Sequence, residues 1–331
     1  MPRFLAPASP AGLQPGRRPT FSVVIPAYQA AATIGDAIAS ARAQSLAPAE
    51  ILVCDDGSTD DLDAAIEPHR GAIELLRQEN RGATAARNAL LRVAGADFVA
   101  PLDADDAWDP ARLERLAELG VARPDLDILA SDAYFVLDGR VSGRFNSETP
   151  FAVERQREAI LDRCFLICPA MRREPLLALG GYDEELSTGE DWDCCIRLIQ
   201  AGALAGLVDE PLLEYRFRRE SLTSRRAQTL LDRVRVLEKA AVNPDLGEGE
   251  LEVLRASLAR DRGRALQQVA REAVLRADPQ ARGRLIAVAR SRNVGVRARA
   301  GALLAAVAPG KARRIVGATQ SDSTGRPPPA N

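Results

Sequence analysis

The chain is organised around one stretch, Asp97-Phe98-Val99-Ala100-Pro101-Leu102-Asp103-Ala104-Asp105-Asp106-Ala107-Trp108. Its five apolar residues, 98–102, are too few for a helix and are typical of a short buried strand. Three carboxylates follow within the next four positions. Like charges this close repel one another, so the cluster favours a nearby cation. The stretch therefore predicts a strand that ends at a negatively charged rim of a sheet.

Carboxylate oxygens are the ligands that suit hard divalent cations such as Mg²⁺ and Mn²⁺. We therefore hypothesise that Asp103 and Asp105 hold a metal ion, and that the metal ion holds a diphosphate. The alternative is a solvated turn in which Asp109 caps a helix that begins near Pro110. The stretch alone favours neither, and the rest of the chain decides between them.

Two earlier apolar runs, residues 21–26 and 51–54, also predict buried strands, and helical patterns alternate with them. Apolar strands that alternate with helices are typical of an α/β protein with a parallel sheet covered on both faces. In such sheets, ligands bind beyond the carboxyl ends of the strands. We therefore expect the segments that follow the three strands, which include Pro26, Asp55 and Asp103, to meet in one crevice.

The composition of the 331 residues, 46% hydrophobic and 27% charged, is ordinary for a globular protein. The net charge of −2 conceals an asymmetry, because residues 211–331 carry 24 Lys and Arg against 12 Asp and Glu, and residues 1–210 carry 20 against 34. The acidic part argues against nucleic acid as a partner, since Lys and Arg bind its phosphates. The basic part predicts peripheral contact with an anionic membrane, with a solvated appendage or a dimer contact as alternatives.

The five cysteines do not predict a disulfide framework, because their number is odd and two of them are adjacent. The Cys164–Cys168 spacing does not predict zinc either, because the only histidine is His69. Free thiols fit a reducing compartment, so we expect a cytoplasmic protein, peripheral at the inner face of the cell membrane if the basic region binds there. No run of 18 apolar residues predicts a membrane-spanning helix.

Composition divides the chain into four parts. Residues 1–19 are rich in Pro, Ala and Gly and predict a disordered leader, and residues 321–331 predict a disordered tail. Residues 20–220 carry the alternation of strands and helices, and residues 221–320 form a basic, α-helical C-terminal extension. The helical patterns of the extension cover residues 225–242, 248–277 and 280–306.

Four motifs follow the predicted strands in order. They are Val24-Ile25-Pro26-Ala27-Tyr28; Asp55-Asp56-Gly57-Ser58-Thr59-Asp60; Asn80-Arg81-Gly82 with Ala86-Arg87-Asn88, leading into Leu102-Asp103-Ala104-Asp105-Asp106; and Gly180-Gly181-Tyr182-Asp183-Glu184 with Gly189-Glu190-Asp191-Trp192. Together they resemble the family 2 glycosyltransferases with a GT-A fold, over about residues 20–220. The resemblance implies a mostly parallel, Rossmann-like sheet between helices, and inverting transfer from a nucleotide-sugar.

The resemblance also implies roles for individual residues. Asp105 would be the direct metal ligand, with Asp103 nearer the ribose, and either Asp55 or Asp56 would accept a hydrogen bond from the nucleobase. Asp191 would be the catalytic base with Glu190 beside it; the alternative for both acids is stabilisation of a helix N-terminus. The residues implied to bind the nucleotide-sugar are Pro26, Ala27, Tyr28, Asp55, Asp56, Asn80, Gly82, Arg87, Asp103 and Ala104.

These residue types fit the chemistry of sugar transfer. A metal ion can neutralise the leaving diphosphate, and a carboxylate can deprotonate the attacking hydroxyl. We expect UDP as the nucleotide, with GDP or dTDP as alternatives, and a saccharide or lipid-linked acceptor in the biosynthesis of a cell-surface polysaccharide or glycoconjugate. The Gln-x-x-Arg-Trp signature of processive synthases is absent from the sequence. The sequence does not tell whether the protein is a monomer or an oligomer.

Three other functions compete with this one. A sugar-phosphate nucleotidyltransferase would carry a Gly-rich loop where this chain has Pro26-Ala27-Tyr28-Gln29. A phosphatase of the haloacid dehalogenase type would carry a small hydroxyl residue or glycine where this chain has Asp106-Ala107. A non-catalytic carbohydrate-binding protein of the same fold would not need its acids at 103, 105 and 191.

Overall fold

The computed structural model describes residues 14, 16–217 and 226–307. These residues form two compact units that divide within residues 218–225. At the start of the first unit, Arg17 pairs with Asp97 at 3.0 Å, and Pro19 is buried. The other residues of the expected leader, 1–13 and 15, and the expected tail, 321–331, lie outside the described residues.

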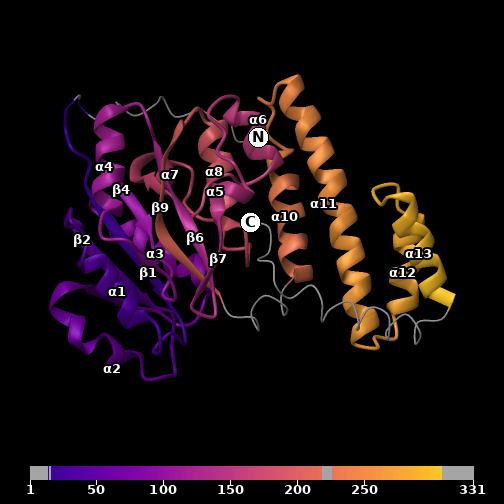
Figure 1. Ribbon diagram of the computed structural model, residues 1–331, viewed down its shortest axis with the longest axis horizontal. Helices are drawn as coiled ribbons and strands as arrows, with labels where there is room; N and C mark the ends of the chain where they lie inside the picture. Colours follow the sequence, from indigo (N-terminus) through magenta and orange to yellow (C-terminus); the bar gives the residue numbers. More distant parts are fainter. Residues whose placement is uncertain (1–13, 15, 218–225, 308–331) are drawn as a thin grey trace. The chain divides into compact units, whose positions relative to one another are not determined.

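One nine-stranded sheet forms the centre of the first unit, in the order β3-β2-β1-β4-β8-β6-β9-β5, with β7 paired to β6 (Figure 1). The first four strands in this order are parallel. β8 is antiparallel to β4 and β6, and β9 is parallel to β6, so the predicted mostly parallel sheet is confirmed. The strands are β1 (Phe21–Ala27), β2 (Glu50–Asp55), β3 (Glu74–Arg77), β4 (Phe98–Pro101), β5 (Ala107–Trp108), β6 (Ile128–Leu137), β7 (Arg140–Arg144), β8 (Ala170–Arg172) and β9 (Ala205–Phe217).

Helices cover both faces of the sheet, which is why its central strands are apolar throughout. Val23 and Ile25 share a hydrophobic core with Ile34 and Ile38 of α1. Val24 points to the other face and is also fully buried, and α3 contacts β1 and β2. The helices are α1 (Ile34–Arg42), α2 (Leu62–Ile66), the 3₁₀ helix η1 (Glu67–Ala72), α3 (Ala83–Val93), α4 (Arg112–Ala122), α5 (Phe145–Glu148), α6 (Gln156–Asp162), α7 (Arg173–Ala178) and α8 (Glu190–Gln200).

The acidic loop after β4 is held by a strand that the sequence did not predict. The two-residue strand β5 follows the loop at once and pairs antiparallel with β9. Asp109 then accepts a hydrogen bond from the backbone N–H of Ala111 at 2.9 Å, just before α4 begins. The helix cap proposed as the alternative for this stretch is not formed at Asp109, because Ala111 occupies the N-cap position of α4 and no side chain caps the helix.

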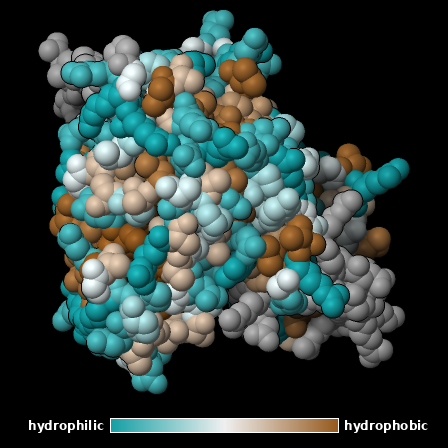
Figure 2. Space-filling view, turned by 60° about the vertical axis from the view of Figure 1, so that its left-hand side comes forward, coloured by the Kyte–Doolittle hydropathy of each residue, from teal (hydrophilic) through white to brown (hydrophobic). Residues whose placement is uncertain are grey.

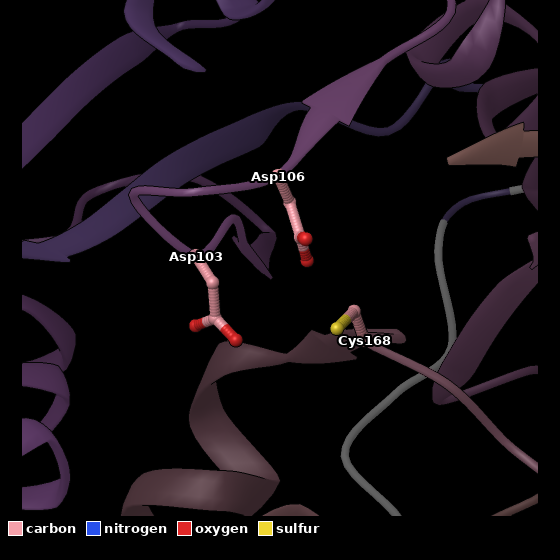
Figure 3. A group of neighbouring side chains, drawn as sticks. All are labelled: Asp103, Asp106 and Cys168. Atoms are coloured by element: carbon pink, nitrogen blue, oxygen red, sulfur yellow. The ribbon is translucent and has the colours of Figure 1, made fainter. Parts of the chain in front are cut away.

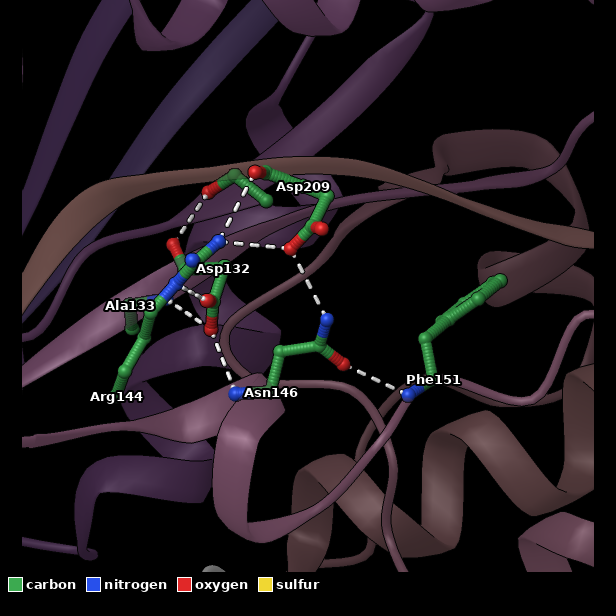
Figure 4. A network of polar contacts seen from close by, with 7 residues as sticks. Asp132, Ala133, Arg144, Asn146, Phe151 and Asp209 are labelled. Atoms are coloured by element: carbon green, nitrogen blue, oxygen red, sulfur yellow. Dashed lines mark hydrogen bonds and ion pairs between the residues drawn. The ribbon is translucent and has the colours of Figure 1, made fainter.

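A buried carboxylate joins β6 to β9 where the register of their pairing shifts (Figure 4). Asp132 is fully buried, accepts hydrogen bonds from the backbone N–H of Ala133 and Asn146 at 2.7 and 2.8 Å, and pairs with Arg144. Arg144 and Asn146 also donate to the Asp209 carboxylate, at 2.7 and 3.0 Å. These bonds fix the β6–β7 hairpin and the loop that follows it to β9.

The second unit is α-helical, as the sequence predicted. Its helices pack in chain order, α10 on α11, α11 on α12 and α12 on α13. The single helix expected over residues 280–306 is wrong, because residues 291–295 form turns. A side chain at Gly263 of α11 would overlap the carbonyl oxygen of Asn293, so this glycine lets the turn pack on α11. The helices are α10 (Arg226–Ala240), α11 (Glu248–Leu275), α12 (Ala281–Arg290) and α13 (Val296–Val307).

The surface is mixed in character. The face shown in Figure 2 is mostly hydrophilic, and its apolar side chains lie in small groups between charged ones. Within the described ranges, every helix is too short or too polar to cross a membrane.

Candidate active site

The loops after β1 and β2 form one wall at the carboxyl edge of the sheet. The Gln29 side chain accepts hydrogen bonds from the backbone N–H groups of Thr59 and Asp60, both at 3.1 Å, and the backbone N–H of Gln29 donates to Ser58 Oγ at 3.1 Å. The Tyr28 side chain stands at this edge and is 52% exposed. Six of the predicted nucleotide-binding residues are buried: Pro26, Ala27, Asp55, Asp56, Arg87 and Ala104.

Asp56, which directly follows β2, holds the loop that precedes α3 against the end of that strand. The buried Asp56 carboxylate accepts hydrogen bonds from the backbone N–H groups of Arg81 and Gly82 at 2.9 and 2.8 Å, and from Gln78 Nε2 at 2.7 Å. The Asp55 carboxylate accepts from the backbone N–H of Ser58 at 2.8 Å. Asp56 therefore stabilises the loop that precedes α3, and Asp55 stabilises the loop that follows β2.

Gly57 allows the same loop to approach closely. Its φ is +74°, and a side-chain Cβ there would lie 2.9 Å from the backbone nitrogen of Asn80. Other residues seldom adopt this conformation and would also clash. The motif that begins at Asp55 and the motif that begins at Asn80 thus pack against each other, as expected if both line one crevice.

Arg87 of α3 connects the acidic loop with the start of α8. Its side chain is 6% exposed, and its guanidinium pairs with both Asp103 and Glu190. Burial acts to lower the pKa of Arg87, but the charges of Asp103, Glu190 and Asp191 outweigh it and hold that pKa well above its ordinary value. A buried charge of this kind is stable only while its partners are present.

Asp191 lies in the first turn of α8, where the helix N-terminus also favours negative charge. Its Oδ1 atom is buried and has no hydrogen-bond partner among the described residues. Burial raises the pKa of Asp191 to about 7; the charge of Arg87 opposes this shift, and those of Glu190 and Asp103 add to it. A carboxylate with a pKa near neutrality is well matched to accept a proton at physiological pH.

A group of possible metal ligands lies in the acidic loop, but its members differ from the predicted pair (Figure 3). One ligand atom from each of Asp103, Asp106 and Cys168 lies within 4.8 Å of the other two. Asp106 accepts a hydrogen bond from the backbone N–H of Arg216 at 2.8 Å, whereas its Oδ2 atom is buried and has no hydrogen-bond partner among the described residues. Asp105 is exposed and stands outside this group, so its role as a ligand stays a prediction. The carboxylates of Asp103 and Asp106 offer the oxygen ligands that Mg²⁺ and Mn²⁺ prefer.

Arg112 of α4 lies fully buried behind this group, a position that the sequence did not predict. It donates to Ser131 Oγ and to the carbonyl oxygen of Cys168, both at 2.7 Å, and lies over the Trp108 ring, 5.0 Å from its centroid. Burial lowers the pKa of Arg112 to about 10. An arginine in an amphipathic helix ordinarily predicts a solvent-exposed position, so only the structure reveals that Arg112 fixes the backbone at Cys168.

The comparison with known families finds a match that covers the loops after β1, β2 and β4 but ends before α8. The family described as glycosyl transferase family 2 matches residues 22–178. Succinoglycan biosynthesis protein ExoU from Rhizobium meliloti (strain 1021) is 34% identical over 202 residues, which are 55% of this chain and 57% of that protein. The chain thus spans little more than half the length of this relative.

Solved structures share the architecture of both units. S. aureus TarS 1–349 in complex with UDP-GlcNAc has a TM-score of 0.64 at 20% identity, covering 92% of each chain. The mannosyltransferase PcManGT from Pyrobaculum calidifontis, in complex with GDP-Man and Mn²⁺, has a TM-score of 0.54 at 23% identity, covering 94% of this chain and 89% of that one. At these identities the likeness shows the fold alone.

Proposed function

We propose that this chain, which matches glycosyl transferase family 2 over residues 22–178 and has a GT-A fold, is a member of that family. It transfers a sugar, with inversion, from a nucleotide-sugar to a saccharide or lipid-linked acceptor. The observation that carries this proposal is the buried bridge from Asp103 through Arg87 to Glu190, beside the unpartnered oxygen of Asp191. The name of the succinoglycan relative supports a role in polysaccharide biosynthesis.

The donor binds, in this proposal, along the wall that the loops after β1 and β2 form. The nucleobase lies near Tyr28, Asp55 and Asp56, and the ribose and diphosphate extend toward Asp103. UDP is the nucleotide expected first, with GDP and dTDP as alternatives. Two solved structures with this fold are complexes with UDP-GlcNAc and with GDP-Man, which supports a nucleotide-sugar donor.

A divalent cation, Mg²⁺ or Mn²⁺, is proposed to bind at Asp103, with Asp105 as the second predicted ligand and the unpartnered oxygen of Asp106 within reach. When bound, it supplies charge neutralisation for the leaving diphosphate. Arg87 holds the Asp103 carboxylate in place for this task through their ion pair.

The reaction itself is a single displacement. Asp191 takes the proton of the acceptor hydroxyl as its oxygen forms a bond to the anomeric carbon, and the bond from that carbon to the diphosphate oxygen breaks with its electron pair. Because attack comes from the face opposite the leaving group, the configuration inverts. Glu190 remains paired with Arg87, which leaves Asp191 as the carboxylate that exchanges a proton.

The nucleotidyltransferase alternative has little support at the loop after β1. Phosphate binding there needs free backbone N–H groups. In this chain the backbone N–H of Gln29 donates to Ser58 Oγ and that of Ala31 to Asp60 at 2.8 Å. The alternative of a non-catalytic carbohydrate-binding protein does not account for the raised pKa of the buried Asp191.

Nucleotide binding should depend on the metal. Isothermal titration of the protein with UDP, GDP and dTDP is expected to show binding of at least one of them with Mn²⁺, and binding at least ten times weaker with EDTA. Asp103→Asn should weaken binding in the same way, because it removes a charged ligand. Asp127→Asn is the control, since Asp127 pairs with Arg172 at the start of β6, and it should bind as the unchanged protein does. The absence of heat with all three nucleotides would contradict the proposal.

Contact with an anionic membrane is proposed for the C-terminal unit. Val296, Leu303, Leu304 and Val307 of α13 are each more than half exposed, and their spacing places them on one face of the helix. Ala302 and Ala306 of the same helix are buried. An exposed apolar face on a basic region is the pattern of a helix that lies in a membrane surface.

The membrane contact should be detectable by liposome flotation. The protein is expected to float with vesicles that contain anionic lipid more than with neutral ones, and the double variant Leu303→Ser with Leu304→Ser should lose most of this binding. The double variant Val141→Ser with Val153→Ser removes two comparably exposed apolar side chains from the first unit and should float normally. Equal flotation of both double variants would exclude α13 as the contact.

A further inference from the structure

We propose that Asp103, Asp106 and Cys168 form a mixed carboxylate–thiolate site for a borderline divalent cation such as Zn²⁺. Their ligand atoms lie within 4.8 Å of one another, and the three side chains point toward a common centre (Figure 3). The Cys164–Cys168 spacing had not predicted zinc. In the structure, the side chains that could bind a metal ion together with the Cys168 thiol are instead the carboxylates of Asp103 and Asp106, which are distant in the sequence.

Asp106 provides the strongest sign that the site receives a ligand. Its side chain is 2% exposed, and only one of its two oxygens is bonded, to the backbone N–H of Arg216. The Oδ2 atom is buried without a hydrogen-bond partner among the described residues. The Asp106 carboxylate faces the group (Figure 3). A buried carboxylate oxygen without a partner is unfavourable, and a cation at the centre of the group removes this cost.

Cys168 is placed firmly on the opposite side of the centre. Arg112 donates a hydrogen bond to its carbonyl oxygen, and Arg112 is itself held by Ser131 and the Trp108 ring. A zinc ion binds sulfur at about 2.3 Å and carboxylate oxygen at about 2.0–2.2 Å, so bound ligand atoms stand roughly 3.5 Å apart.

The sulfur ligand determines which cation the site prefers. Thiolate ligands select Zn²⁺ and Co²⁺ over Mg²⁺, and the thiol proton passes to the solvent when the metal binds. Three protein ligands leave one position open for water or another oxygen donor. The site shares Asp103 with the proposed Mg²⁺ or Mn²⁺ site, so the two cations exclude each other. A test of cysteine ligation does not depend on the proposed sugar transfer.

Cobalt absorption tests the site directly. Titration of the full chain with Co²⁺ is expected to give thiolate-to-metal charge-transfer absorption that saturates at one ion per chain and disappears when Zn²⁺ is added. Cys168→Ser should lose this absorption. Cys164→Ser is the matched control, because Cys164 is also buried four residues away and its thiol donates to the carbonyl oxygen of Leu166. Absorption that is absent from the unchanged protein, or that persists in Cys168→Ser, overturns the proposal.

X-ray absorption of the zinc-loaded, unchanged protein covers the case in which Cys168→Ser fails to fold. The expected result is one sulfur neighbour at about 2.3 Å together with oxygen neighbours. A zinc shell that contains only oxygen and nitrogen overturns the proposal.

Discussion

Replacing Asp191 with asparagine is expected to lower the rate of sugar transfer by about 10²- to 10⁴-fold, with little change in nucleotide affinity. The asparagine keeps the shape of the side chain but cannot accept the proton of the acceptor hydroxyl. Transfer would be measured with the donor found in the binding screen, and affinity by titration of the same nucleotide. Transfer at the original rate would show that Asp191 is not the base.

Asp193→Asn is the matched control for this experiment. Asp193 is an aspartate on the same helix, but it is buried against Arg197, with which it pairs at 2.7 Å. Its loss should reduce stability and leave transfer close to normal at a permissive temperature. A large loss of transfer in both variants would point to damage to α8 instead of removal of a base.

The pH dependence of Asp191 provides an independent check. Its pKa is raised to about 7 in the folded protein, so the transfer rate of the unchanged protein should rise up to about pH 7 and then level off. The unfolded chain ionises this residue near pH 3.8, so between that value and 7 the folded state alone retains the proton. Stability therefore falls as the pH rises through this window. Asp191→Asn should be the more stable protein by a few kcal/mol above pH 7, with no difference near pH 4, in denaturant titrations.

Replacing Arg87 with glutamine is expected to reduce the free energy of unfolding by about 3–5 kcal/mol and to abolish transfer. The substitution leaves Asp103 and Glu190 without the charge that both of them contact, in a place from which water is largely excluded. Arg87→Lys keeps the charge but cannot reach both carboxylates with a planar fork, so it should be intermediate. Denaturant unfolding and transfer assays would measure the two effects.

Arg172→Gln separates stability from function in this comparison. Arg172 is also a buried arginine paired with one aspartate, Asp127, at 2.7 Å. The Arg172→Gln variant should lose a similar free energy of unfolding but keep its transfer activity at low temperature. The Arg172–Asp127 pair lies at the opposite end of the strands from the acidic loop. An Arg87→Gln variant as stable as the unchanged protein would contradict the view that Arg87 holds the site together.

The sequence was sufficient to predict the sheet, because its central strands are buried on both faces and therefore stand out as continuous apolar runs. It also placed Asp103 and Asp191 in one crevice through the resemblance to a known family. It named Asp105 as a ligand and did not indicate the inward position of Asp106, because the direction of a side chain in an irregular loop depends on which backbone groups bond to it. Here the backbone N–H of Arg216, more than a hundred residues away, turns Asp106 inward.

Cys168 and Arg112 were missed for a related reason. Their contact joins residues 56 positions apart, and neither residue type suggests the other. The raised pKa of Asp191 likewise depends on burial beneath neighbouring segments, which no local pattern reports. The interruption of the last long helix was visible only weakly, as Asn293 and Gly295 within an otherwise helical stretch.

The attachment of Asp106 to Arg216 sets a practical limit on shortening the protein. Arg216 is the penultimate residue of β9, and chain ends that are cut at the edge of a strand tend to fray. A truncated form that stopped directly after Phe217 would loosen the very amide that orients Asp106. Isolation of the first unit therefore calls for an end point several residues further on.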